Sequence, residues 1–385
     1  MKYIVVLGDG MPDHPIEEWN GMTPLEKAVT PNLDRLSLSG ELGLVDVIPQ
    51  GLPAGSDVGH LSVLGYDPKR YYTGRAPIEA AAMGISLGPA DVAFRCNLVT
   101  LGQEKTVLQD FSASHIPSEK SHPLIRDLNE RLAPEFPGIS FHAGVGYRHL
   151  MVWKNGVSGM TLTPPHDITD KPIESFLPKG EQALFIWGMI QKSWKALEGN
   201  GTEANSIWLW GQGRATTLKP FDRPGGIISA VDIVRGVGVL AGLEVIDVPG
   251  ATGYFDTAYE AKAQYALESL DRHDFVFVHV EATDEAGHMG DRDKKVMAIG
   301  DLDRRLIGPL LDGLGRFGDY RLLVTSDHAT PVALKTHTPD PVVYLIYDSR
   351  RREKKGGRRF TEKEAAKTGV RIKVGYEMMG RFWES

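Results

Sequence analysis

The sequence has very little cysteine and no long apolar run. Cys96 is the single cysteine among 385 residues. One thiol cannot form an internal disulfide, so the chain carries no mark of an oxidising compartment. No apolar run approaches about 18 residues, the length that a membrane-spanning helix requires, and the first run is too short for a signal peptide. We therefore expect a cytoplasmic protein with no membrane partner.

The sequence also has no excess of positive charge. It contains 43 Lys and Arg against 50 Asp and Glu, which gives a formal net charge of −7. Proteins that bind nucleic acids need a basic patch or stripe to contact phosphates. We interpret the one dense basic run, residues 350–359, as a solvated surface loop. We therefore expect no nucleic-acid partner.

What is present is the pattern of an α/β protein. Hydrophobic residues make up 42% of the chain and charged residues 24%, as in ordinary globular proteins. Short β-branched runs typical of buried strands lie at residues 4–7, 275–280, 322–325 and 342–346. Apolar residues recur at helical spacing over residues 31–39, 258–270 and 296–314. Strands that alternate with helices in this way predict a largely parallel sheet.

The middle of the chain follows a different pattern. Strand patterns at residues 92–101, 139–153 and 207–211 are separated by loops rich in Pro, Gly and Ser. A chain of 385 residues is long enough for two domains, or for one large domain with an insertion. We predict a discontinuous core domain, residues 1–86 and 220–385, interrupted by a smaller α+β domain, residues 87–219.

Seven residues scattered along the chain can build one site for two metal ions. They are Asp9, Ser56, Asp284, His288, Asp327, His328 and His337. Most of them come directly after a buried-strand pattern, and in open α/β sheets ligands collect beyond the carboxyl ends of the strands. Carboxylate and imidazole without thiolate suit Mn²⁺, Co²⁺ or Zn²⁺. Taken singly, these residues have ordinary alternatives: a turn former, a loop pair, a capped turn or a surface histidine.

Ser56 has two interpretations. It precedes an apolar-periodic stretch, so its hydroxyl can accept a backbone N–H as a helix N-cap. Alternatively it is a nucleophile, because the free amides and positive dipole end of a helix stabilise a phosphate group. A serine hydroxyl is too weakly acidic to attack at neutral pH unaided, so this role requires a metal. The residues by themselves leave both interpretations open.

Motifs along almost the whole chain carry a family resemblance. They are Gly8-Asp9-Gly10, Thr23-Pro24-Leu25, Thr30-Pro31-Asn32-Leu33-Asp34, Gly55-Ser56-Asp57, Gly65-Tyr66-Asp67-Pro68, Tyr71-Tyr72-Thr73-Gly74-Arg75, Asp91-Val92-Ala93-Phe94-Arg95-Cys96-Asn97, Pro249-Gly250-Ala251-Thr252-Gly253, Thr283-Asp284-Glu285-Ala286-Gly287-His288 and Ser326-Asp327-His328. With these motifs the chain resembles the alkaline phosphatase superfamily, and more closely the archaeal-type branch of the cofactor-independent phosphoglycerate mutases. The resemblance implies an alkaline-phosphatase-like core with an inserted domain.

The resemblance also implies roles for the seven residues. Ser56 would be the phosphorylated nucleophile of an enzyme that interconverts 3-phosphoglycerate and 2-phosphoglycerate without a bisphosphoglycerate cofactor. One divalent ion would be held by Asp9, Ser56, Asp327 and His328, and the other by Asp284, His288 and His337. The implied ion is Mn²⁺, with Zn²⁺, Co²⁺ or Mg²⁺ as alternatives. The inserted domain would hold the glycerate and keep water from the phosphoserine.

Candidate substrate-binding residues come mostly from the predicted insert. They are Arg75, Arg95, Asn97, Arg148, His149, His166 and Asp167. Arginine offers a planar fork that matches carboxylate or phosphate. The other side chains lie in loops or at strand ends, where binding residues concentrate. Structural salt bridges are the alternative for Arg95 and Arg148.

One segment departs from the family pattern. Archaeal-type mutases carry an Asp-Arg-Arg-Ala-Gly-Arg segment where this chain has Asp110-Phe111-Ser112-Ala113-Ser114-His115. Residues 164–168 and 208–213 resemble a bacterial side branch proposed to phosphorylate homoserine. The alternative is therefore a metal-dependent phosphotransferase acting on homoserine or a related small hydroxy or amino acid. The large insert argues against a plain phosphohydrolase. The lack of a Cys/Ser-x-Pro-x-Arg segment argues against a sulfatase, and the filled site against a non-catalytic module.

Overall fold

The computed structural model describes residues 1–351 and 358–384, so the basic run at 350–359 lies partly outside the described residues. The chain folds into two compact units. We call residues 1–72 with 218–385 the core unit, and residues 73–217 the inserted unit. No described helix is both long and apolar enough to cross a membrane.

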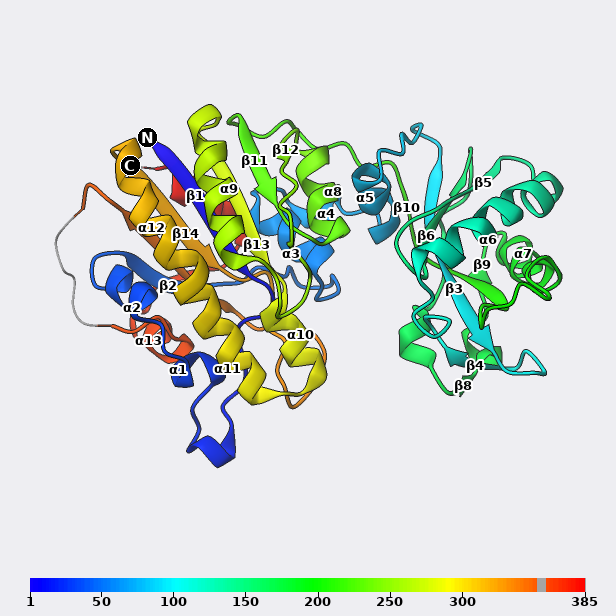
Figure 1. Cartoon of the computed structure of the whole chain (residues 1–385), viewed down its shortest axis with the longest axis horizontal. Helices are drawn as coiled ribbons and strands as arrows, with labels where there is room; N and C mark the ends of the chain where they lie inside the picture. Colours follow the sequence, from blue (N-terminus) through cyan, green and yellow to red (C-terminus); the bar gives the residue numbers. More distant parts are fainter. Residues whose placement is uncertain (352–357, 385) are drawn as a thin grey trace. The chain divides into compact units, whose positions relative to one another are not determined.

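The described part of the core unit is built on an eight-stranded sheet, in the order β12-β11-β13-β1-β14-β15-β2-β16. The strands are β1 (Lys2–Gly8), β2 (Glu41–Val45), β11 (Gly225–Ile228), β12 (Glu244–Val245), β13 (Phe275–Val280), β14 (Tyr320–Thr325), β15 (Val342–Asp348) and β16 (Arg371–Ile372). The first five strands in this order, from β12 to β14, run parallel to one another. Strand β15 is antiparallel to both of its neighbours, β14 and β2. The predicted largely parallel sheet is confirmed, with β13, β1 and β14 side by side (Figure 1).

The central strands end together at one edge of the sheet. Strands β1, β13 and β14 are buried along nearly their whole length, which explains why each is a continuous apolar run. In the parallel register Gly8 pairs with Val280, and Leu7 pairs with Thr325. The residues that follow these strands therefore meet at the same edge. That edge carries the candidate site.

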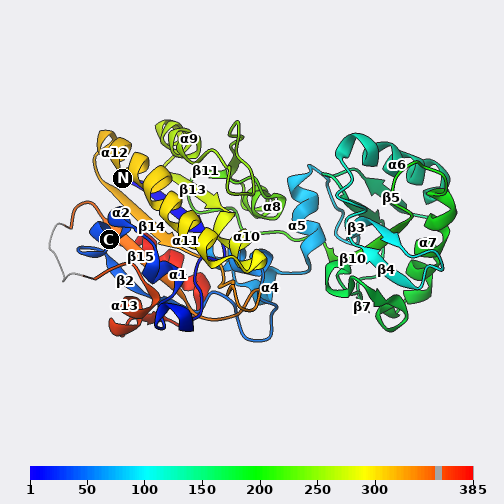
Figure 2. The ribbon, with the colours of Figure 1, turned by 60° about the horizontal axis from the view of Figure 1, so that its bottom comes forward.

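Helices cover the sheet of the core unit. They are α1 (Pro24–Lys27), α2 (Pro31–Ser37), α3 (Ser56–Val63), α4 (Pro68–Tyr71), α8 (Asp232–Leu240), α9 (Tyr259–Arg272), α10 (Ala282–Met289), α11 (Arg292–Asp301), α12 (Gly308–Leu314), α13 (Glu362–Lys367) and α14 (Met378–Trp383). Helices α9, α11 and α12 lie over one face of the sheet (Figures 1 and 2). The predicted helices at 31–39 and 258–270 are confirmed as α2 and α9. The third consists of α11, a π-helix at Leu302–Ile307, and α12.

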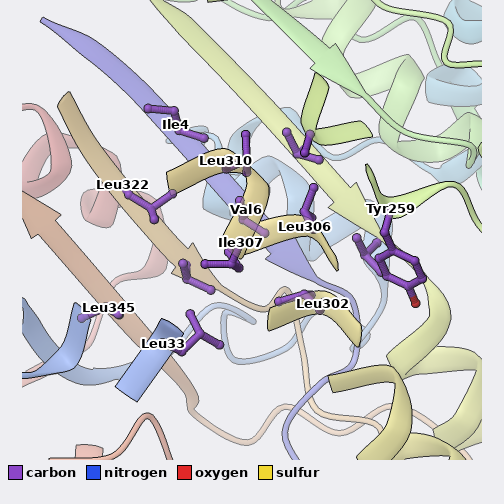
Figure 3. Close-up of a cluster of buried hydrophobic side chains, with 14 of the residues drawn as sticks. Ile4, Val6, Leu33, Tyr259, Leu302, Leu306, Ile307, Leu310, Leu322 and Leu345 are labelled. Atoms are coloured by element: carbon purple, nitrogen blue, oxygen red, sulfur yellow. The ribbon is translucent and has the colours of Figure 1, made fainter. Parts of the chain in front are cut away.

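The π-helix and α12 pack their apolar side chains against the strands (Figure 3). Leu302, Leu306 and Leu310 are fully buried together with Ile4 of β1 and Leu322 of β14. Burying a side chain of this size stabilises a fold by roughly 1.5–3 kcal/mol. This packing holds β1 and β14 against the helices that cover them.

The inserted unit has a separate antiparallel sheet. Its strands are β3 (Val92–Leu101), β4 (Val107–Asp110), β5 (Ile139–His142), β6 (Arg148–Trp153), β8 (Lys171–Pro172) and β10 (Ser206–Arg214), with β7 (Met160–Thr161) and β9 (Lys179–Gly180) as a small ribbon. Its helices are α5 (Arg75–Ala82), α6 (Ser118–Arg131) and α7 (Ala183–Ala196). Short 3-10 turns span Glu17–Trp19, Ala133–Glu135, Pro165–Ile168, Ile173–Phe176, Gly315–Phe317 and Gly375–Glu377 along the chain. The strands expected at 92–101, 139–153 and 207–211 correspond to β3, to β5 with β6, and to β10.

The first junction between the units lies earlier than residue 86. Ala76 and Ala80 of α5 are fully buried against Ala93 of β3 and Leu150 of β6. Residues 73–86, which the sequence analysis assigned to the core domain, therefore pack within the inserted unit. Alanine is a weak marker of an apolar helix face, so an eight-residue helix of this kind gives little periodic pattern.

Candidate metal centre

Three carboxylates meet where β1, β13 and β14 end. Asp9 follows β1, Glu281 follows β13, and Asp327 comes two residues after β14. Backbone contacts fix this edge: the Asp9 amide donates to Val280 O at 2.9 Å, and the Gly10 amide donates to Asp327 Oδ1 at 3.2 Å. The parallel register therefore gathers residues that are about 270 to 320 positions apart in the chain.

Asp9, Asp327 and His328 form the first of two ligand groups. One ligand atom from each lies within 4.8 Å of the others, and all three side chains are fully buried. His328 Nε2 is 3.4 Å from Asp9 Oδ1 and 3.2 Å from Asp327 Oδ2. Within the described residues, neither of these two oxygens accepts a hydrogen bond.

Asp284, His288 and His337 form the second group. Helix α10 places Asp284 and His288 four residues apart on one side, with His288 Nε2 3.1 Å from Asp284 Oδ2. His337 Nε2 lies 3.5 Å from Asp284 Oδ1. The Nδ1 atoms donate to the carbonyls of Lys335 and Ala54, at 3.1 and 3.2 Å. Both rings thus turn Nε2 toward the carboxylate, as metal-binding histidines do.

Thr330 links the two groups. Its hydroxyl donates to Asp284 Oδ1, so its oxygen can accept from His328 Nδ1 at 3.2 Å. This bond leaves the lone pair of His328 on Nε2, the nitrogen that faces the first group. The His328 ring also stacks on the His337 ring, with centroids 3.9 Å apart and an interplanar angle of 27°.

Ser56 lies beside the first group. Its Oγ is 3.4 Å from His328 Nε2, and the side chain is 8% exposed. Helix α3 begins at Ser56 and has Gly55 as its N-cap, so the Ser56 hydroxyl does not cap the helix. A Cβ on Gly59 would lie 2.7 Å from both Cβ and O of Asp327. Glycine at this position therefore lets α3 approach the turn that carries the ligands.

The carboxylates of the site repel one another inside the protein. Burial raises the pKa of Asp9 well above its usual value, and the charges of Asp327 and Glu281 raise it further. Burial and the charge of Asp284 raise the pKa of Glu281 to about 8. Buried charges are unfavourable unless a counter-charge pairs with them. Together with the unpaired oxygens of Asp9 and Asp327, this donor set fits divalent metal ions.

In the second group, the imidazoles lower the pKa of the carboxylate, and the carboxylate raises the pKa of one imidazole. Burial would raise the pKa of Asp284, but hydrogen bonds from His288 and His337 hold it well below its usual value. Burial lowers the pKa of His288, yet the bond to Asp284 and its charge bring it to about 9. A protonated imidazole thus supplies the charge that a metal ion would otherwise supply, and metal binding would release this proton.

Four residues of this site were not among the sequence candidates: His60, His279, Glu281 and Thr330. One ligand atom each of Asp9, His60 and His279 lies within 4.8 Å of the others. Glu281 comes directly after the run 275–280, so the rule that identified Asp9 applies to it as well. His279 interrupts that run, which is otherwise apolar, and an isolated polar residue in a buried strand is a usable indication. Thr330 lies in an irregular segment, and no sequence pattern marks it.

In the inserted unit, Arg75 and Arg95 share one carboxylate. Arg75 Nε donates to Glu79 Oε1 at 2.8 Å, and Arg95 Nε lies 3.0 Å from Glu79 Oε2. Burial raises the pKa of Glu79, but the two guanidinium charges keep it below its usual value. The Arg95 guanidinium also lies 4.5 Å from the ring centroid of Trp210. Arg95 therefore makes the internal ion pair that was its alternative interpretation.

Asn97 and His149 are buried and have internal partners. Asn97 Oδ1 accepts from Trp210 Nε1 at 3.1 Å, and its Nδ2 donates to Phe111 O at 3.2 Å. His149 Nδ1 accepts from the Gly144 amide at 3.0 Å, and burial lowers the pKa of His149 to about 3. These contacts account for the Asn97 side chain and for Nδ1 of His149, whereas His149 Nε2 has no hydrogen-bond partner within the described residues.

Arg148, His166 and Asp167 are exposed. The Arg148 guanidinium lies 5.1 Å from the ring centroid of Tyr147. Within the described residues it makes no ion pair within 4.0 Å. His166 packs edge-on against Trp210, at 5.3 Å between centroids. Arg148 is thus the candidate whose charge remains available to a ligand.

The segment that departs from the family pattern forms a strained turn. Ala113, Ser114 and His115 have φ values of 48°, 58° and 50°, a left-handed conformation that costs about 1–2 kcal/mol per residue. Asp110 holds the turn, since its carboxylate accepts from the amide of Ser114 at 2.8 Å. The turn presents the His115 ring 6.0 Å from Tyr147, the ring that Arg148 also contacts.

Fold and site together define a class: an α/β enzyme with a serine at a helix start beside buried carboxylates and imidazoles. Residues 38–202 match the family described as 2,3-bisphosphoglycerate-independent phosphoglycerate mutase. A probable mutase of this name from Geobacter sulfurreducens is 47% identical over 98% of each chain. One from Methanosarcina barkeri is 46% identical over 99% of this chain and 98% of its own. The chain belongs to the 2,3-bisphosphoglycerate-independent phosphoglycerate mutase family.

Solved structures agree with this assignment. A cofactor-independent phosphoglycerate mutase from Thermoplasma acidophilum is 25% identical, with a TM-score of 0.64 and coverage of 99% of both chains. A protein from Pyrococcus horikoshii is 30% identical, with a TM-score of 0.81, over 99% of this chain and 96% of its own. The similarity thus extends over both units.

Proposed function

We propose that this enzyme interconverts 3-phosphoglycerate and 2-phosphoglycerate through a phosphoserine at Ser56, without a bisphosphoglycerate cofactor. The observation that carries the proposal is the position of Ser56 Oγ, at the uncapped start of α3 and 3.4 Å from His328 Nε2. Membership of the mutase family supports the same reaction. The alternative acceptor, homoserine, has no support among the relatives described above.

Two groups of residues would hold divalent ions. Asp9, Ser56, Asp327 and His328 would hold one ion, and Asp284, His288 and His337 the other. We propose Mn²⁺, because carboxylate and imidazole donors without thiolate suit it, with Zn²⁺, Co²⁺ or Mg²⁺ as alternatives. Two ions bound there supply positive charge that makes the serine more acidic and neutralises the phosphoryl oxygens.

The chain's own groups then carry the transfer. Ser56 Oγ loses its proton and attacks the phosphorus of 3-phosphoglycerate; the bond between phosphorus and the substrate's C3 oxygen breaks, and that oxygen takes up a proton. The positive end of α3 stabilises the phosphoryl group on the serine. The C2 hydroxyl of the glycerate then loses its proton and attacks the phosphoserine; the bond between Ser56 Oγ and phosphorus breaks, and Oγ takes up a proton, which restores Ser56. No proton or phosphate is gained or lost over the cycle.

We propose that the arginines of the inserted unit bind the acid groups of the substrate. Arg75 and Arg95 carry two positive charges and share the single negative charge of Glu79, so the three groups together have a net charge of about +1. Arg148 adds an exposed guanidinium, which suits a carboxylate or phosphate. His166 and Asp167, also exposed, are secondary candidates, whereas the internal bonds of Asn97 and His149 favour a supporting role.

We further propose a cytoplasmic location, with no nucleic-acid or membrane partner. The one cysteine, Cys96, is buried in β3 without a disulfide, as is usual in a reducing compartment. The net charge of −7 is unfavourable for binding nucleic acid.

A coupled assay for 2-phosphoglycerate tests the proposed reaction. The protein is given 3-phosphoglycerate and Mn²⁺ with no bisphosphoglycerate. We expect turnover of roughly 1–10³ per second, abolished by EDTA and restored by Mn²⁺. A folded protein that binds Mn²⁺ but shows no turnover would contradict the proposal.

A further inference from the structure

His279 is a buried histidine that the proposed reaction does not use. It is the last residue but one of β13, its side chain is fully buried, and its neighbours in the strand are apolar. A polar ring in such a place is unfavourable unless both nitrogens have partners. The contacts of the two nitrogens therefore indicate what the residue does.

Both ring nitrogens of His279 have close partners. Nε2 lies 2.8 Å from Asp9 Oδ2, and Nδ1 lies 3.0 Å from Ser229 Oγ. The backbone carbonyl of His279 accepts from the buried Nζ of Lys262 at 2.9 Å, which fixes this end of the strand. The imidazole thus joins the turn after β11 to the first ligand of the proposed metal centre.

Ser229 determines which nitrogen carries the proton. Its oxygen accepts from the Val231 amide at 3.0 Å, so its hydrogen is available to another acceptor. That acceptor is His279 Nδ1 at 3.0 Å, because Val231 O is 3.5 Å away, at the limit for a hydrogen bond. A neutral ring that accepts at Nδ1 has its hydrogen on Nε2.

The Nε2 hydrogen has two carboxylates within reach. Glu281 Oε2 lies 3.4 Å from Nε2, longer than the 2.8 Å to Asp9 Oδ2, so Asp9 is the stronger acceptor. The His60 ring lies edge-on to the His279 ring at 5.0 Å between ring centroids, and within the described residues its Nε2 has no hydrogen-bond partner. With Oδ2 engaged, Asp9 keeps Oδ1 for the first group, 3.4 Å from His328 Nε2.

We propose that His279 is a positioning residue for the metal centre: Ser229 selects its tautomer, and its Nε2–H fixes the Asp9 carboxylate so that Oδ1 is presented as the ligand. The inference rests on the proposed metal centre. An outer residue that fixes a ligand in this way typically changes metal affinity by about tenfold to a hundredfold.

A pair of substitutions separates this role from mere filling of space. His279→Gln keeps a side-chain N–H that can reach Asp9, whereas His279→Phe keeps the volume and has no donor. We expect His279→Phe to weaken one of two Mn²⁺ sites by about tenfold or more, with the site of Asp284 unchanged. His279→Gln should bind Mn²⁺ within about threefold of the wild type.

The readout is Mn²⁺ binding to the full chain without substrate, by calorimetry and electron paramagnetic resonance. Circular dichroism establishes that each variant is folded. Equal Mn²⁺ affinity in folded His279→Phe and in the wild type would overturn the inference. An equal loss of Mn²⁺ affinity in folded His279→Gln and His279→Phe would also overturn it. If the His279→Phe chain does not fold, Ser229→Ala replaces it. This variant removes the tautomer control and should weaken the same site, and unchanged affinity would overturn the inference.

The same titration separates this inference from the proposed reaction. Wild-type protein that binds two Mn²⁺ ions but forms no 2-phosphoglycerate would contradict the mutase activity, while the variants still decide the role of His279. Wild-type protein that binds no Mn²⁺ would overturn the inference itself.

Discussion

Asp9 and Asp327 each keep one buried oxygen that accepts no hydrogen bond within the described residues. In the same space, the Nε2 atoms of His288 and His337 lie 2.9 Å apart and turn toward Asp284. Protein interiors rarely leave buried carboxylate oxygens such as those of Asp9 and Asp327 without a partner. At the scale of single residues, these unpaired oxygens support the proposed pair of cation sites.

His337→Ala should weaken one metal site selectively. The change leaves the second group with two protein ligands in place of three, so we expect that site to lose at least about tenfold in Mn²⁺ affinity. The first group should be unaffected. Calorimetric titration measures both affinities, and His122→Ala, a histidine of the inserted unit, is the control. Unchanged stoichiometry and affinity would exclude His337 as a ligand.

Arg148→Ala should impair substrate binding more than folding. The guanidinium is exposed, so its loss should leave stability nearly unchanged. Losing a charge-assisted hydrogen bond to an acid group corresponds to about tenfold or more in KM, with a smaller effect on kcat. Steady-state kinetics test this, with the exposed Arg131→Ala of α6 as the matched control. A KM equal to the wild-type value would remove Arg148 from the substrate site.

At the scale of elements, one family motif is explained by helix capping. Asp303 in the π-helix accepts from the amides of Asn32 and Leu33, at 3.2 and 2.8 Å, and from Asn32 Nδ2 at 3.1 Å. Its carboxylate thus caps the start of α2 from a distant part of the chain. The motif at residues 30–34 therefore has a structural role at the start of α2.

Asp303→Ala should destabilise the core unit. It leaves two backbone amides at the start of α2 without their acceptor, which we expect to lower the free energy of unfolding by about 2–4 kcal/mol. Asp301→Ala is the control, because Asp301 pairs with the exposed Arg304, and such pairs contribute less than about 1 kcal/mol. Urea unfolding measures both. Equal losses in the two variants would contradict the capping role.

Strand ends were the part of the site that sequence could predict. A buried parallel strand is a continuous apolar run, so the residue after it, such as Asp9, is recognisable. The choice of tautomer at His279 and the contact from Thr330 depend on residues brought together by folding, which no local pattern encodes. The assignment of α5 to the inserted unit was missed for a similar reason. Its alanines form part of a hydrophobic core only where they pack against β3 and β6.

At the scale of the whole molecule, the two ends of the chain are joined in the core unit. Glu362 in α13 accepts from the Asp13 amide at 3.2 Å and from Thr23 Oγ1 at 2.8 Å. Asp13 in turn pairs with the fully buried Lys295 at 2.8 Å. The sheet also joins the two flanks of the insertion, because β1 from the first flank lies between β13 and β14 from the second. The core unit therefore needs both flanks of the insertion, as the discontinuous domain predicted from the sequence requires.

Glu362 should make the stability of the core unit depend on pH. Burial raises the pKa of Glu362 to about 7, although its hydrogen bonds lower it. A folded-state pKa above the unfolded value means that its stabilising contribution is complete below about pH 4.5 and is lost as the pH rises through about 7. The slope reaches at most roughly 1.4 kcal/mol per pH unit.

Urea unfolding between about pH 5 and pH 8 tests this dependence. Glu362→Gln cannot ionise, so its stability should fall less steeply than that of the wild type. Glu364→Gln on the same helix, whose carboxylate pairs with Lys367 near the surface, should keep the wild-type profile. Parallel profiles for Glu362→Gln and the wild type would contradict the assignment.

The most direct test of the account is to locate the phosphate on the enzyme. Mn²⁺-loaded protein is mixed with 3-phosphoglycerate, quenched in acid, and digested for peptide mass spectrometry. The account predicts phosphate on Ser56, and a folded Ser56→Ala chain that carries no phosphate and has lost essentially all turnover. Phosphate on another residue, or turnover that survives in Ser56→Ala, would contradict it.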